Sequence, residues 1–173
     1  MSKIHSYPEW FNNSLNINDE LIEGKKLTLN NQKFIFSNGI LRSQDLYSSN
    51  QTQTKDTFSF KWKKTDTYED NLTIILKDWL NEKYGKAENY ISNNRQGYLL
   101  LDAGCGSGVS GLGYFSSVKK NIKYVGADIS EAIDVAKIRM KEKNFDGNFI
   151  QCDLMNLPFK KSMFDIIFSE GVL

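Results

Sequence analysis

The sequence predicts an α/β fold, a doubly wound parallel sheet of about four strands with helices packed on it. Short apolar runs recur in the second half of the chain, amphipathic stretches separate the first of them, and a glycine-rich turn follows the first run. Strands that alternate with helices pair in parallel through right-handed crossovers. Their carboxyl ends should therefore meet at one edge of the sheet.

The chain is expected to divide into an N-terminal cap or extension, residues 1–66, and the α/β domain, residues 67–173. The extension is polar, and we expect it to be irregular or helical apart from one hairpin. Asn38-Gly39 predicts that hairpin, because it is a strong turn signal between two apolar runs. Residues 48–55 are rich in Ser, Thr, Gln and Asn, which is typical of a loop.

A helix is expected to open the α/β domain. Thr67 and Asp70 have the spacing of a capping box, and Gly85 is placed to end the helix in a left-handed conformation. The apolar positions that we expect to face inward are Leu72, Ile75, Leu76, Trp79 and Leu80.

The four apolar runs predict strands at residues 98–101, 123–127, 148–151 and 164–168. A helix that starts near Ser107 should follow the first strand and bury Val109, Leu112, Phe115 and Val118. A second helix, with Ser130 as its cap and Glu131 in its first turn, should bury Ala132, Ile133, Ala136 and Met140. A loop through residues 157–159 should join the last two strands.

The balance of charges argues against two classes of partner. The 22 basic and 21 acidic residues are interspersed and leave a net charge of +1, which favours neither nucleic acid nor an anionic membrane. No apolar run resembles a signal sequence or a membrane span. Cys105 and Cys152 lack the neighbours that a disulfide framework or a zinc site needs. We therefore expect a cytoplasmic protein without a metal site.

A glycine-rich turn lies between the first strand and its helix, with Gly104, Gly106 and Gly108 at alternate positions. Glycine allows a sharp bend and close approach of a ligand, and the helix end that follows favours a carboxylate or a phosphate. The motif indicates nucleotide or cofactor binding, and a tight structural turn is the other interpretation. We interpret Cys105 as a packing residue rather than a nucleophile, because no histidine accompanies it.

Two acidic residues follow later strands. Asp128 ends the second strand, where a carboxylate can accept both hydrogen bonds of a ribose diol. Asp153 follows the third strand and could accept a hydrogen bond from an adenine amino group. The other interpretation of Asp128 is a charge at a helix N-terminus, and that of Asp153 is turn chemistry. The glycine turn and two acids at neighbouring strand ends together favour one adenosyl ligand.

Four segments carry a resemblance to a known family: LLDAGCGSG (100–108), VGADIS (125–130), CDLMNLPF (152–159) and FDIIFSE (164–170). In this order they resemble the successive motifs of class I S-adenosylmethionine-dependent methyltransferases of the type-11 kind. The resemblance runs from about residue 98 to residue 173 without a gap. It implies a Rossmann-like fold, S-adenosylmethionine as cofactor and methyl transfer to an unidentified acceptor, for which a small molecule is expected.

The resemblance also implies a role for each matched residue. Around the methionine part of the cofactor it implies Asp102, near the ammonium group, and the turn residues Gly104, Cys105, Gly106 and Gly108. Around the adenosine it implies Asp128 at the ribose hydroxyls, Ile129 against the adenine, and Asp153 and the N–H of Leu154 at the adenine edge. Ser169 and Glu170 would border the transferred methyl group. In the upstream segment 53–62, Phe58 and Trp62 either cover the cofactor or belong to the core.

The implied chemistry asks little of acids and bases. Methyl transfer from a sulfonium is an in-line displacement, so positioning should dominate. An acceptor hydroxyl or acidic carbon would need a base, and the matched segments contain no candidate. His5, the only histidine, lies far from them in the sequence. The catalytic residues are therefore unassigned.

Two other functions fit parts of the sequence. Gly106, Gly108 and Gly111 spell G-x-G-x-x-G, as in NAD-dependent oxidoreductases, but Asp102 would then place a negative charge close to a pyrophosphate. A non-catalytic cofactor-binding or scaffolding subunit would keep the fold and rely on a partner for chemistry.

The family continues beyond its fourth strand, whereas this sequence ends at Leu173. An apolar fourth strand would then be left as a bare edge. We therefore expect either a fragment of a longer product or a partner chain that supplies the missing strands.

Overall fold

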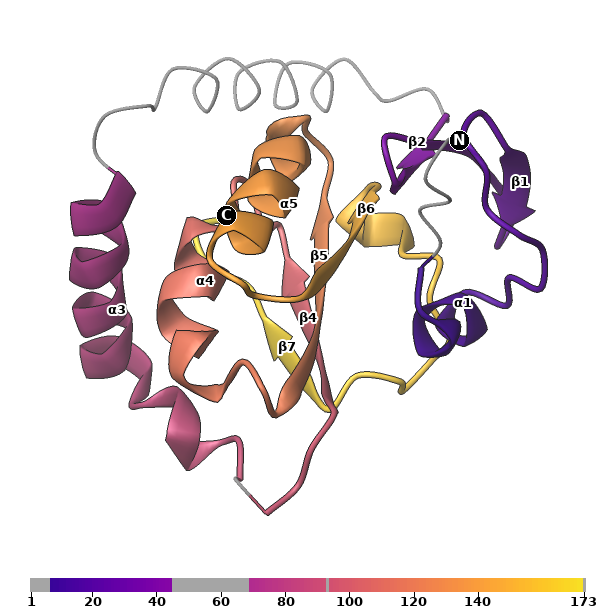
Figure 1. Ribbon diagram of the computed structural model, residues 1–173. Helices are drawn as coiled ribbons and strands as arrows, with labels where there is room; N and C mark the ends of the chain where they lie inside the picture. Colours follow the sequence, from indigo (N-terminus) through magenta and orange to yellow (C-terminus); the bar gives the residue numbers. More distant parts are fainter. Residues whose placement is uncertain (1–6, 45–68, 93, 173) are drawn as a thin grey trace.

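The computed structural model describes residues 7–44, 69–92 and 94–172. Within these ranges, seven strands form one mixed sheet in the order β1-β2-β3-β6-β5-β4-β7 (Figure 1). Its parallel part consists of β4 (Tyr98–Ala103), β5 (Ile122–Asp128), β6 (Gly147–Gln151) and β7 (Ile166–Phe168). The predicted α/β fold and its four parallel strands are confirmed.

The sheet is larger than predicted, because N-terminal residues extend it. They form β1 (Lys26–Leu29), β2 (Gln32–Ser37) and β3 (Ile40–Ser43), which pair antiparallel with one another. β3 then pairs in parallel with β6, where Leu41 lies opposite Ile150. The expected hairpin is confirmed as β2 and β3, whereas the prediction that the rest of the extension is irregular or helical is wrong for β1.

The predicted hairpin is the turn between β2 and β3. Asn38 and Gly39 have φ angles of +54° and +68°, the left-handed conformation that tight hairpin turns require at both central residues. The predicted division between residues 66 and 67 lies outside the described residues and stays a prediction.

Helices lie on both faces of the sheet. α3 (Glu69–Tyr84), α4 (Val109–Phe115) and α5 (Ala132–Glu142) lie on one side, and α1 (Glu9–Ser14) lies on the other (Figure 1). Successive strand residues alternate between two apolar cores, so that Leu100 packs with the first group of helices and Leu101 with the α1 segment. Burial on both faces explains why the strands are continuous apolar runs. Short 3₁₀ turns are η1 (Ala87–Asn89), η2 (Ser116–Val118) and η3 (Leu154–Asn156).

The predicted inward positions of α4, its 3₁₀ extension and α5 are all buried. In α3 the prediction is partly wrong, because Leu80 is fully buried but Ile75 and Trp79 are 63% and 43% exposed. α3 contacts α4 where the backbone of Thr73 and Lys77 approaches Gly113, and this contact leaves Ile75 and Trp79 on the outer side. No helix in the described ranges is long and apolar enough to cross a membrane.

The end of α3 is as predicted, since Gly85 follows it with a φ of +80°. Thr67, the proposed cap at the other end, lies outside the described residues. β7 is shorter than predicted, and Ile167 is 67% exposed while Phe168 is buried. Asp165 precedes the strand and accepts a hydrogen bond from the N–H of Leu99 at 2.9 Å. The strand predicted at residues 164–168 is therefore confirmed over residues 166–168.

Tyr7 joins the added strands to the parallel sheet. Its hydroxyl donates to the carbonyl oxygen of Phe149 in β6 at 2.6 Å and accepts from the N–H of Leu41 in β3 at 2.8 Å. The side chain is buried, and burial raises the pKa of Tyr7, so the hydroxyl stays protonated. One hydroxyl therefore links both strands at their junction.

The substitution Tyr7→Phe is expected to lower the free energy of unfolding by about 1–3 kcal/mol, because it leaves buried backbone groups without their partner. Urea unfolding followed by circular dichroism measures the loss. Tyr98→Phe is the control, since the Tyr98 hydroxyl only accepts a 3.4 Å hydrogen bond from Ser92 near the surface. Equal losses in the two variants would contradict the bridging role of Tyr7.

Candidate functional site

The bend between β4 and α4 depends on its glycines. Gly104 and Gly108 have φ angles of +78° and +77°, a conformation that L side chains disfavour. The N–H groups of Gly104 and Cys105 donate to the carbonyl oxygen of Ala127 at 2.8 and 3.1 Å, so the bend starts against the end of β5. α4 begins at Val109, two residues later than predicted, because Gly108 adopts the left-handed conformation.

Asp128, the last residue of β5, ties the bend to the next turn. Its Oδ2 accepts from the N–H of Gly106 at 2.8 Å, and its Oδ1 accepts from the N–H and hydroxyl of Ser130 at 2.7 and 2.6 Å. Asp128 is 8% exposed. The glycine bend and the turn at Ser130 thus share one hydrogen-bond acceptor, which lies 22 residues after Gly106 in the sequence. The predicted proximity of Asp128 to the glycine turn is confirmed.

Asp102 is more enclosed than a ligand-facing carboxylate would be. It is 2% exposed, and its Oδ2 accepts a hydrogen bond from the Tyr124 hydroxyl. α4 covers this pair at Gly111, where an added Cβ would lie 2.3 Å from the Asp102 oxygen. Burial raises the pKa of Asp102 to about 7, the Tyr124 hydrogen bond opposes the shift, and the charge of Asp128 adds to it. Contact of Asp102 with a ligand stays a prediction.

Cys105 packs rather than reacts. It is 9% exposed and belongs to the core beneath α4 and α5. Burial raises the pKa of the Cys105 thiol well above its usual range, so the nucleophilic thiolate is disfavoured. This agrees with its interpretation as a packing residue.

The loop after β6 lies beside the end of β5. The N–H of Cys152 donates to the carbonyl oxygen of Asp128 at 2.9 Å. Asp153 accepts from the N–H of Met155 at 2.9 Å and thereby caps η3. Asp153, Leu154 and Ile129 are each half-buried. The structure therefore brings both predicted acids to one edge of the sheet, and the turn chemistry considered for Asp153 is present as well.

The segment after β7 packs onto the glycine bend. The Ser169 hydroxyl donates to the carbonyl oxygen of Ala103 at 2.9 Å. Glu170 accepts a hydrogen bond from the Tyr84 hydroxyl at 2.5 Å, at the end of α3. A Cβ added at Gly104 would lie 2.3 Å from Cγ2 of Val172. Val172 thus takes the space above Gly104, and a ligand that contacts this glycine must displace it.

Three supporting residues escaped the sequence analysis: Tyr124, Tyr84 and Arg139. Gly111 was considered there only as part of the G-x-G-x-x-G pattern. Arg139 of α5 donates a buried hydrogen bond to the carbonyl oxygen of Ser107 in the glycine bend. Its signal was present, because position 139 lies beside the inward stripe of α5 at helical spacing. Tyr84 gave no signal, since nothing in the sequence connects the end of α3 to Glu170. The upstream segment 53–62, with Phe58 and Trp62, lies outside the described residues.

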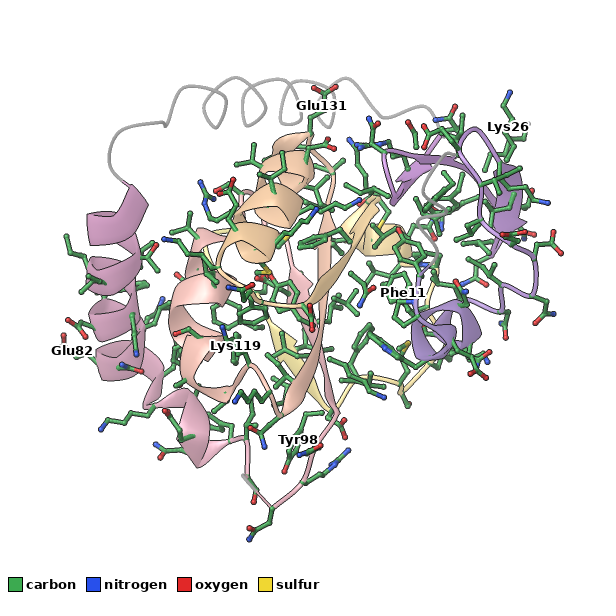
Figure 2. All side chains as sticks on the ribbon, viewed as in Figure 1. Phe11, Lys26, Glu82, Tyr98, Lys119 and Glu131 are labelled. Atoms are coloured by element: carbon green, nitrogen blue, oxygen red, sulfur yellow. The ribbon has the colours of Figure 1, made fainter. Side chains whose placement is uncertain are left out.

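The carboxyl ends of the parallel strands form the edge of the sheet that carries these groups. Figure 2 shows Glu131 at the end of α5 that lies next to the carboxyl ends of the strands, whereas Lys119 and Tyr98 lie toward the opposite edge. One edge of the sheet thus carries all the parts of the candidate site. These are the glycine bend, Asp128 and Asp153, the turn with Ile129, and the segment with Ser169 and Glu170. Such an edge is where open α/β sheets bind their ligands.

A family described as a methyltransferase domain matches residues 94–173. This range starts shortly before β4 and includes β7, so it contains all the predicted site residues.

Two curated relatives match parts of the chain. Demethylmenaquinone methyltransferase of Lactococcus lactis is 37% identical over 75 residues, which are 41% of this chain and 29% of the relative. Probable tRNA methyltransferase 9B of Bos taurus is 27% identical over 109 residues, which are 62% of this chain and 21% of the relative. The chain thus spans less than a third of the length of either relative.

Among solved structures, the fold is similar to geranyl diphosphate C-methyltransferase from Streptomyces coelicolor, which was solved with Mg²⁺, geranyl diphosphate and S-adenosyl-L-homocysteine. The TM-score is 0.52 at 16% identity, over 72% of this chain and 54% of that chain. At this identity the similarity concerns the fold.

Asp102 predicts a pH dependence of stability. The pKa of Asp102 is about 7 in the folded protein, against 3.8 for an ordinary aspartate. Between these values the folded state binds more protons than the unfolded state, so the free energy of unfolding should fall as the pH rises from about 4 to 7. Asp102→Asn cannot ionise, so its loss of stability across this window should be smaller. Urea unfolding at pH 5 and pH 7.5 measures the difference. Asp78→Asn, on an exposed side of α3, is the control. Parallel curves for the wild type and Asp102→Asn would contradict the raised pKa.

Proposed function

We propose that this protein uses S-adenosylmethionine as a methyl donor, since its residues 94–173 match a family described as a methyltransferase domain. One observation carries the proposal: the Asp128 carboxylate meets the glycine bend at Gly106, at the carboxyl ends of adjacent parallel strands. An adenosyl ligand needs an acidic acceptor for its ribose hydroxyls beside a backbone that it can approach closely.

The residues at the edge fit this ligand. Gly104 has no Cβ, and the space above it is wide enough for the Val172 side chain, so the methionine part can lie there once Val172 moves. A carboxylate has about four acceptor positions, and Asp128 uses three of them for the N–H of Gly106 and the N–H and hydroxyl of Ser130. About one position is thus left for a ribose hydroxyl. Ile129 would pack against the adenine.

The remaining roles follow the order of the strands. Asp153 and the N–H of Leu154 would bind the adenine edge, and Ser169 and Glu170 would border the sulfonium. Asp102 would act from beneath the bend, by fixing β4 under α4. The bound cofactor supplies an activated methyl group, and the chain binds and orients it for in-line displacement. The acceptor's base is not assigned to any residue.

We favour a small molecule as the methyl acceptor. Its net charge of +1 and interspersed charges give no basic stripe for a phosphate backbone. The relatives' names include both demethylmenaquinone and tRNA, so a tRNA acceptor is the second candidate. Two free, buried cysteines fit a reducing cytoplasm.

Isothermal titration calorimetry tests the cofactor. S-adenosyl-L-homocysteine should bind, and NAD at the same concentration should give no heat, because a pyrophosphate would meet the acids at the bend. Binding of NAD instead would favour the oxidoreductase alternative. Methyl transfer by the isolated chain to any acceptor would exclude the non-catalytic subunit.

Gly104→Ala should weaken S-adenosyl-L-homocysteine binding at least tenfold, because its Cβ enters the space that the ligand needs. Gly24→Ala is the matched control: Gly24 has a φ of +81°, so alanine is similarly strained there, but nothing lies within 4 Å of the added Cβ and the residue lies before β1. Both variants should lose stability, whereas only Gly104→Ala should lose affinity. Equal affinities would contradict the proposed position of the ligand.

A further inference from the structure

A row of three side chains crosses the ends of β3, β6 and β5. Arg42 lies opposite Gln151, and Gln151 lies opposite Asp128 in the parallel register. Residues in register point to the same face of a sheet. Arg42, in the last of the added strands, therefore stands two strands away from Asp128, on the same face.

Arg42 has three partners, of which the carbonyl oxygen of Ser37 in β2 accepts from its Nε at 3.4 Å. Its guanidinium makes a bidentate contact with Asp134 in the first turn of α5, with Nη2 to Oδ1 at 2.6 Å and Nη1 to Oδ2 at 3.0 Å. Nη1 also donates to Oε1 of Gln151 at 2.9 Å. The Arg42 side chain is only 15% exposed. This arrangement needs the planar fork of arginine, which lysine cannot reproduce.

Gln151 passes this constraint to the turn after β5. Because Oε1 faces Arg42, the amide Nε2 faces the carbonyl oxygen of Ile129 and donates to it at 3.1 Å. Gln151 is buried, and rotation of its amide would place two acceptors face to face. The turn that carries Ile129 and Ser130 is thus held through Gln151 and, at α5, through Asp134.

We propose that Arg42 is a positioning residue for the adenosyl end of the site, acting through Gln151 and Asp134 on the turn that contains Ile129 and Ser130. This inference rests on the proposed function for its ligand. It assigns the added N-terminal strands a part in cofactor affinity, because a turn that is ordered before binding costs less free energy to order on binding.

The chain offers a matched control in Lys137. Its Nζ donates to the carbonyl oxygens of Asn38 and Gly39 at 2.6 and 3.0 Å, so it also ties the hairpin to α5. Its charge acts on Asp134 and Arg42, but its hydrogen bonds within the described residues go to the hairpin and not to Gln151 or the turn after β5. Loss of Lys137 should therefore loosen the hairpin without loosening the turn.

An open hollow of about 430 Å³ borders the network and is lined by Asn38, Arg42, Ser43, Gln44, Glu131, Asp134 and Gln151. Shortening Arg42 should enlarge this water-accessible hollow rather than create a closed void. The variants should therefore fold, and urea unfolding measures how much stability each one loses.

The test compares S-adenosyl-L-homocysteine affinity, by calorimetry, in Arg42→Ala, Arg42→Lys, Gln151→Glu and Lys137→Ala. Arg42→Ala should weaken binding at least fivefold, and Arg42→Lys should recover little of the loss. Gln151→Glu keeps an acceptor for Arg42 but loses the donor to Ile129, so it should also weaken binding at least fivefold. Lys137→Ala should change affinity less than twofold. Unchanged affinity in Arg42→Ala, or an equal loss in Lys137→Ala, would overturn the proposal.

A second readout needs no ligand. Hydrogen exchange of the backbone amides of Ile129 and Ser130 in the free protein should be faster in Arg42→Ala and Gln151→Glu than in the wild type and in Lys137→Ala. If the wild type fails to bind S-adenosyl-L-homocysteine, the proposed function fails, and exchange still decides whether Arg42 holds the turn. Unchanged exchange in Arg42→Ala would refute the positioning role.

Discussion

Parallel pairing holds β4, β5 and β6 in a fixed register, and each feature of the site depends on it. Ala103 lies opposite Ala127, and Asp128 lies opposite Gln151, so the three strands end together. A slip by one residue would turn Asp128 to the opposite face of the sheet. The carboxylate would then lose the N–H of Gly106, and the glycine bend would lose its anchor.

Asp102 and Asp128 differ in what surrounds them, although both face the helices and both are buried. α4 covers Asp102 at Gly111, whereas Asp128 is 8% exposed and lies beside the glycine bend. Tyr124 satisfies the buried carboxyl, whose pKa of about 7 leaves much of it protonated at neutral pH. We therefore interpret Asp102 as a buried residue that supports the glycine bend from below, and Asp128 as the hydrogen-bond acceptor beside the bend.

The N-terminal residues complete the sheet in two ways. β3 pairs with β6 and extends the sheet, while Phe11 of α1 packs in the core on the face opposite α4 (Figure 2). They also contact the loop after β6, because Gln32 donates to the carbonyl oxygen of Asn156 at 2.6 Å and Phe159 packs against Phe11. The turn after β5 and the loop after β6, which form the proposed adenosyl end of the candidate site, thus both contact the N-terminal residues.

The four parallel strands could be predicted because their signals are local: apolar runs, a glycine turn and acids at the strand ends. The pairing of β3 with β6 could not, since Leu41 and Ile150 are distant in sequence and neither strand carries a mark of its partner. The turn between β1 and β2 left a weak signal in the sequence, the pair Asn30-Asn31. Both residues have positive φ, which asparagine adopts more readily than most residues. The burial of Asp102 could have been predicted from Leu100, because strand residues two positions apart lie on the same face of the sheet.

If three adjacent strand ends bind one adenosyl ligand, a crystal structure of the chain with S-adenosyl-L-homocysteine will show it. We expect ribose hydroxyls within hydrogen-bond distance of Asp128, adenine between Ile129 and Leu154, and Val172 moved away from Gly104. A ligand bound at another surface, with Val172 still packed on Gly104, would contradict it.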